Sequence, residues 1–204
     1  MPKWSPDGEW LLFVSGEHYN CHPHIVKKDG TGLKKLADRG GYLGVVERLK
    51  HPDFHSESSD VPVWSADGRH VFYTAKVGES IELMRVDLGG KTTQMTKSKP
   101  GKRHYHPAAS PDGKWLLFGS DRGGTMQPNA ASIDGKQSWP ITNVPDVSCA
   151  MHGNWQPETT RGERWGTGVR SRDFTPERDS HALHPQPLDA ASILTVAIQS
   201  IHSR

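Results

Sequence analysis

A ten-residue segment that occurs three times limits what this chain can fold into more than any other feature of its sequence. The copies are WSPDGEWLLF from Trp4, WSADGRHVFY from Trp64 and ASPDGKWLLF from Ala109. Within each copy, a Ser-x-Asp-Gly turn precedes an apolar run, because Asp can hydrogen-bond its own backbone and Gly adopts a positive φ. The apolar run has the length and composition of a β-strand. The sequence therefore predicts tandem β-units that begin alike.

Each copy continues with a second Asp-containing turn and a short closing segment, so that four antiparallel strands fit into one unit. The spacing of about 45 residues between Asp67 and Asp112 matches a four-stranded propeller blade. The clearest strands are expected at Trp10–Val14, His70–Thr74, Ile81–Val86 and Trp115–Ser120. In the third unit, Pro128 lacks a backbone donor, and we expect damage to the strand that contains it.

The predicted fold class is all-β, an incomplete β-propeller of four-stranded antiparallel blades with an irregular C-terminal tail. The expected parts are blades at about 1–40, 60–103 and 104–149, an insertion at 40–59, a stub of a fourth blade at 150–157 and a non-repeat tail at 158–204. Propellers need four or more blades to close, so open blade edges are expected, and such edges favour self-association. A repeat that stops within a unit also suggests a truncated or frame-altered form of a longer propeller.

Composition excludes several classes of protein. The formal net charge is +2, and no basic stripe is interleaved with aromatic residues, which argues against a nucleic-acid binder. No apolar run is long enough to span a membrane. The tail is rich in charged residues, Gly and Pro, and we expect it to be disordered. The first residues, MPKWSPDGEW, do not have the pattern of a signal peptide.

The pattern W-S-P-D-G-x-x-apolar-x-F, followed by a strand, D-G and a closing L-T or I-T, resembles the repeat of TolB-type β-propellers. The resemblance covers residues 1 to about 157. It implies that the strand before each Ser-x-Asp-Gly turn is the innermost one and lines a central channel. It also implies a non-catalytic module that binds a protein or peptide partner at the rim or channel mouth. A periplasmic or extracytoplasmic location follows from the resemblance alone, so the compartment stays open.

Histidines on the predicted inner strands are the main chemical signal. His104 and His106 are two residues apart, and the alternation of a strand would point both to one face. Alignment of the repeats places His152 on the next inner strand at the position of His106. Three imidazoles can hold a divalent ion such as Mn²⁺ or Zn²⁺. The alternative is that these histidines hydrogen-bond water in a polar channel.

The histidine arrangement is also similar to that of oligogalacturonate lyases, which are propeller enzymes. This resemblance implies His104, His106, His152 and Gln156 as ligands of a manganese-type ion, and Arg103 as a partner of a sugar carboxylate. No catalytic base can be named, and no G-x-S-x-G or H-E-x-x-H motif is present. The preferred function is therefore the binding module. The alternative is a metal-dependent lyase that acts on acidic, uronate-containing oligosaccharides.

Overall fold

The computed structural model describes residues 2–16, 21–42, 61–143 and 155. These residues form twelve strands in three four-stranded antiparallel sheets. The first sheet contains β1 (Lys3–Trp4), β2 (Trp10–Ser15), β3 (His22–Lys27) and β4 (Lys34–Lys35). The second contains β5 (Val63–Trp64), β6 (His70–Val77), β7 (Ser80–Asp87) and β8 (Thr92–Gln94). The third contains β9 (His104–Ala109), β10 (Trp115–Ser120), β11 (Gln127–Ser132) and β12 (Ser138–Pro140).

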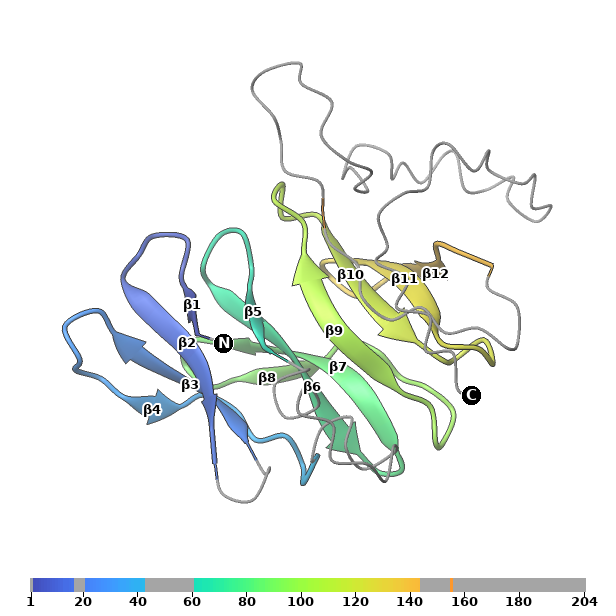
Figure 1. The fold of residues 1–204 in the computed structure, drawn as a ribbon, viewed down its shortest axis with the longest axis horizontal. Coiled ribbons are helices and arrows are strands. Elements are labelled where there is room, and N and C mark those ends of the chain that lie inside the picture. Colours follow the sequence, from blue (N-terminus) through green and yellow to red (C-terminus); the bar gives the residue numbers. More distant parts are fainter. Residues whose placement is uncertain (1, 17–20, 43–60, 144–154, 156–204) are drawn as a thin grey trace, which may run out of the picture.

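The three sheets stand side by side in chain order, as blades of an open propeller (Figure 1). In each sheet the strands are hydrogen-bonded in sequence order, and β9 packs against β6 and β7 of the preceding blade. The predicted fold class, an incomplete propeller of four-stranded antiparallel blades, is confirmed. Most of the predicted insertion, the stub apart from Trp155, and the tail lie outside the described residues. Within the described ranges no helix is long and apolar enough to cross a membrane.

The third blade is intact, so the expected damage at Pro128 is wrong. Pro128 pairs with Gly119 in the regular register of β10 and β11, and its carbonyl accepts a hydrogen bond from the Ile141 N–H at 2.9 Å. The N and O of a strand residue point to the same side, so the missing donor faces the chain just beyond the end of β12. Pro23 occupies the same position in β3, with Leu36 as the donor to its carbonyl. Proline is tolerated here because little ladder remains to be lost.

The Ser-x-Asp-Gly turns are held by a repeated set of side-chain contacts. In the turn before β10, the Ser110 hydroxyl donates to Asp112 Oδ1 at 2.6 Å and accepts the Trp115 N–H at 2.9 Å. The turns at Ser5 and Ser65 have the same contacts, and Ser132 adds a fourth example between β11 and β12. Each serine thus links its turn to the backbone N–H of the residue five positions later, at or next to the start of the following strand.

Replacing Ser110 with Ala is expected to lower the free energy of unfolding by about 1–2 kcal/mol, because the Trp115 N–H would lose its acceptor in a buried place. Ser110 is 1% exposed. The matched control is Ser132→Ala, at a partly exposed turn with the same contacts, where water can replace the hydroxyl. Chemical denaturation measures both variants. Equal losses in the two would show that burial of the turn is not what makes the serine important.

Tryptophan side chains join successive blades. The Trp64 Nε1–H donates to the Lys3 carbonyl at 3.1 Å, and Trp64 packs in a core cluster with Leu12, Ile25 and Val71 from two blades. The Trp155 Nε1–H donates to the Ala108 carbonyl at 2.8 Å in the same way. Trp155 therefore contacts the third blade as Trp64 contacts the first, which is the position expected for the start of a fourth copy.

Trp4 is the counterpart of these tryptophans in the first blade. It is 56% exposed, whereas Trp64 is 8% exposed. The exposed face belongs to a blade with no described blade on that side (Figure 1). Self-association through such a face stays a prediction.

Candidate functional site

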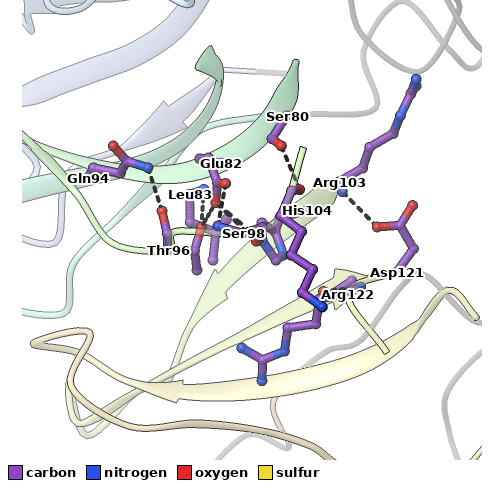
Figure 2. A network of polar contacts seen from close by, with 12 residues as sticks. Ser80, Glu82, Leu83, Gln94, Thr96, Ser98, Arg103, His104, Asp121 and Arg122 are labelled. Carbon is purple, nitrogen blue, oxygen red and sulfur yellow. Dashed lines mark hydrogen bonds and ion pairs between the residues drawn. The ribbon is translucent and has the colours of Figure 1, made fainter. Parts of the chain in front are cut away.

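A buried polar network lies at the junction of the second and third blades (Figure 2). Its members come from the start of β7, the segment that follows β8 and the start of β9: Glu82, Thr96, Ser98 and His104. Glu82 is 2% exposed and His104 is 0% exposed. A carboxylate is rarely buried to this extent unless several groups bind it.

The Glu82 carboxylate is the centre of the network, because the other three residues all contact it. Thr96 Oγ1 donates to Oε2, and the Ser98 N–H donates to Oε1 at 2.8 Å. His104 Nε2 lies 3.4 Å from Oε2 and 2.7 Å from Ser98 Oγ. Thr96 Oγ1 also accepts the Leu83 N–H at 2.9 Å. Because Thr96 and Ser98 are both bound, Lys97 is held between two fixed residues.

Two opposing effects act on the pKa of Glu82. Burial raises the pKa, and the hydrogen bonds from His104, Thr96 and Ser98 outweigh burial, so the pKa lies below its ordinary value of 4.5. A carboxyl group with a lowered folded-state pKa stabilises the fold above its unfolded pKa. That contribution is lost as the pH falls through the folded-state value.

We therefore expect the stability difference between the native protein and a Glu82→Gln variant to shrink as the pH falls from about 6 to 3. Several turn aspartates, including Asp7 and Asp67, also have lowered pKa values, so the native curve alone would not isolate Glu82. Denaturant titrations of both proteins across this range give the difference directly. A difference that stays constant or grows toward low pH would show that the Glu82 carboxylate is not the group involved.

A hollow with a volume of about 570 Å³ lies next to the network. Four of its lining residues carry a positive charge: Lys97, Lys99, Lys102 and Arg122. The rest of the lining is uncharged and comes from the segment after β8, from the turns at either end of β11 and from the start of β12: Met95, Thr96, Ser98, Gly123, Gly124, Gly135 and Ser138. The described lining thus contains cations and no carboxylate.

Arg122 is the most unusual of these cations. It lies in the turn between β10 and β11, where its backbone N–H donates to Ser120 Oγ at 3.2 Å. Its guanidinium is partly buried, and within the part of the chain that the structure describes this group has no hydrogen bond or ion pair. Burial lowers the pKa of Arg122. The guanidinium nevertheless stays charged at any ordinary pH.

The junction between the first and second blades, called the first junction below, has the same backbone arrangement as the junction between the second and third blades, called the second junction. The charges of the side chains differ between the two. The Leu36 N–H donates to the Pro23 carbonyl, and the Met95 N–H donates to the Leu83 carbonyl, each at 2.8 Å. Leu36 and Met95 are therefore equivalent positions. Asp38 and Lys97 each lie two residues further along the chain, so Lys97 corresponds to Asp38.

At the first junction the charged side chains have partners. Asp38 accepts a hydrogen bond from Lys35 Nζ at 2.6 Å. Arg39 donates to the carbonyl and the hydroxyl of Thr74, each at 2.8 Å, and its guanidinium lies 4.4 Å from the Tyr42 ring centroid. Ser98 takes the corresponding place at the second junction. Among the described residues, the concentration of unpaired positive charge is therefore particular to the second junction.

The structure places three of the sequence-predicted site residues. His104 lies between the blades, with Nε2 on Ser98 and Glu82, and its Nδ1 has no hydrogen-bond partner among the described residues. The Arg103 N–H donates to Asp121 Oδ1 at 2.7 Å. His106 has a φ of 54° and lies where the register of β9 and β10 shifts. Simple alternation from His104 to His106 is therefore wrong, because a β-bulge interrupts it.

The predicted metal set stays a prediction. His152 and Gln156 lie outside the described residues. Among the residues that are described, no group of three or more His, Cys, Asp or Glu side chains could hold a metal ion. The same holds for the metal-dependent lyase that the set would serve. Metal analysis of the native protein and of a His106→Ala, His152→Ala double variant tests the metal set, and detection of unsaturated products from pectic oligomers tests the lyase.

Sequence reasoning missed Glu82, Ser98 and Arg122. One signal was available for Glu82, which lies in a predicted strand between Ile81 and Leu83. Middle strands of a propeller are covered on both faces by neighbouring blades, so an acidic residue there needs buried partners. No comparable signal marks Arg122, because only the folded chain shows that its guanidinium is partly buried without a partner among the described residues.

Comparison with known proteins agrees with the observed architecture, although no family model matches the chain. An uncharacterized protein of Agrobacterium fabrum is 30% identical, over 76% of this chain and 60% of that protein. TolB from Acinetobacter baumannii is 20% identical, with a TM-score of 0.53 over 73% of this chain and 33% of TolB. An oligogalacturonate lyase from Vibrio parahaemolyticus is 16% identical, with a TM-score of 0.48 over 68% of this chain and 38% of the lyase.

The fold defines a protein built from β-propeller blades. More particularly, its repeats have the fold of TolB-type propellers, as the sequence resemblance predicts. The chain spans 60% of the length of the Agrobacterium fabrum relative and a third of the TolB chain. The likeness to the lyase is too low to support an argument about chemistry.

Proposed function

We propose that this chain is a binding module for a protein or peptide partner, and that the hollow between the second and third blades is its binding site. The observation that carries the proposal is the lining of the hollow, which among the residues that the structure describes combines four cationic side chains with no carboxylate. Charged residues that line a hollow without internal partners are available to an external ligand.

The size and the support of the hollow fit this role. Its volume of about 570 Å³ lies within the range of sites that hold small ligands or short peptide segments. Glu82 fixes the part of the lining that follows β8, through its hydrogen bonds with Thr96 and the Ser98 N–H. Lys97, between these two residues, is therefore positioned before a ligand arrives. A preorganised site loses less conformational entropy on binding.

Selection from a random peptide-display library tests the proposed function and does not require the partner to be identified first. The native chain is immobilised and presented with the library, with Lys97→Glu, Lys99→Glu as the altered site and Arg69→Glu as the control. Arg69 is an exposed cation in the Asp-Gly turn of the second blade, away from the lining. We expect enriched peptides that bind the native protein and the control, and not the altered site. No enrichment above the bare support, or equal binding to all three proteins, would contradict the proposal.

A further inference from the structure

We propose that the hollow recognises an acidic peptide segment, and that Arg122 pairs with one of its side-chain carboxylates. The inference rests on the proposed function and adds the chemical class of the ligand. It depends on three features: a guanidinium with no partner among the described residues, the surrounding lysines, and a volume and lining that suit a peptide better than a small anion.

The guanidinium of Arg122 needs a partner that the described residues do not supply. Its pKa is lowered by burial, and none of the described carboxylates raises it. Partial burial of an unpaired charge is unfavourable for the free protein. A guanidinium presents its donors in a planar fork that matches the two oxygens of a carboxylate. A ligand carboxylate would therefore remove the cost of burial and form two parallel hydrogen bonds.

The lysines extend the positive charge beyond one contact. The ammonium groups of Lys97 and Lys99 have no hydrogen bond or ion pair within the described residues, and Lys102 Nζ donates to the Asp121 carbonyl at 3.0 Å. The nearby Glu82 carboxylate is bound by Thr96 and Ser98, and among the described residues it forms no ion pair with these lysines. A peptide with several acidic side chains could pair with these cations in succession.

The lining separates a peptide from other anions. None of the lining residues that the structure describes is aromatic, so these residues offer nucleotide bases no stacking surface. A single phosphate is small beside a hollow of about 570 Å³ and would reach only part of the lining. Gly124, in the same turn as Arg122, borders open space, since no atom lies within 4 Å of a Cβ built on it.

Fluorescence anisotropy with two labelled peptides tests the inference. One is an eight-residue peptide of Glu and Gly, and the other has Gln in place of every Glu. We expect the acidic peptide to bind the native protein and the Gln peptide not to bind. Arg122→Glu should weaken binding of the acidic peptide at least ~30-fold, and Arg122→Lys about 5–10-fold, because lysine keeps the charge and loses the fork. Arg69→Glu makes the same charge change outside the hollow and should stay within about twofold of native binding.

A second measurement separates binding from folding. Because the Arg122 guanidinium has no partner among the described residues of the free protein, Arg122→Gln should leave the melting temperature unchanged or higher while binding is lost. A melting temperature that falls by several degrees together with binding would make Arg122 a structural residue and overturn the inference.

The remaining outcomes are also decisive. Inorganic phosphate that displaces the acidic peptide at low millimolar concentration would show a phosphate site instead. Equal loss of binding in Arg69→Glu and Arg122→Glu would show only diffuse charge attraction. Library peptides that bind at the hollow without excess Asp or Glu, and independently of Arg122, would overturn this inference and leave the proposed binding module standing.

Discussion

Replacing Glu82 with Ala is expected to lower the free energy of unfolding by about 3 kcal/mol. The substitution removes the acceptor of the Thr96 hydroxyl and the Ser98 N–H, and it removes the nearest acidic partner of His104. Removing one member of a buried polar pair costs this much because the remaining groups stay desolvated without partners. Denaturant unfolding monitored by tryptophan fluorescence gives the value.

The control for this prediction is Glu79→Ala, at an exposed position in the turn between β6 and β7. It makes the same chemical change three residues away and should alter stability by less than about 0.5 kcal/mol. The binding site should also respond, because the Ser98 N–H bond fixes Lys97 and Lys99. If Glu82→Ala and Glu79→Ala lose similar small amounts, the buried network does not hold this junction together.

Replacing Trp64 with Ala should have an effect at least as large, about 3–5 kcal/mol. The change removes a side chain that is 8% exposed between two blades and the hydrogen bond from its Nε1–H to the Lys3 carbonyl. Trp4→Ala is the matched control, because Trp4 occupies the same position in its own repeat and is 56% exposed. We expect that control to lose less than about 1.5 kcal/mol. Comparable losses at both positions in denaturant unfolding would contradict the account of how the blades pack.

The strands could be predicted from the sequence because the repeat carries both the turn chemistry and the apolar run. The third blade illustrates this, since Trp115–Ser120 is the observed extent of β10. The second blade shows where the prediction of strand ends fails. There β6 continues to Val77 and β7 begins at Ser80, and a tight turn at Gly78, which has a φ of 61°, joins them. Lys76 and Glu79 near this turn are polar, so a prediction based on apolar periodicity ends the first strand too early and begins the second too late.

The site could not be predicted in the same way, because it depends on which residues of different repeats meet. A histidine on an inner strand is expected to face the channel, whereas His104 turns between the blades toward Glu82. The bulge at His106 depends on a left-handed backbone conformation that a non-glycine residue rarely adopts. The positive charge of the hollow depends in part on Lys97, which occupies the position of Asp38 at the first junction. That correspondence is clear only once the equivalent hydrogen bonds are known.

Hydrogen–deuterium exchange of the native protein, with and without a peptide selected from the library, tests the central claim most directly. We expect slower exchange in the peptide complex at the backbone amides of residues 95–99, 102 and 122–124, which line the hollow. The corresponding segment of the first junction, residues 36–42, should exchange as in the free protein. Protection at the Asp-Gly turns or at the first junction, with no change around the hollow, would show that the hollow is not the binding site.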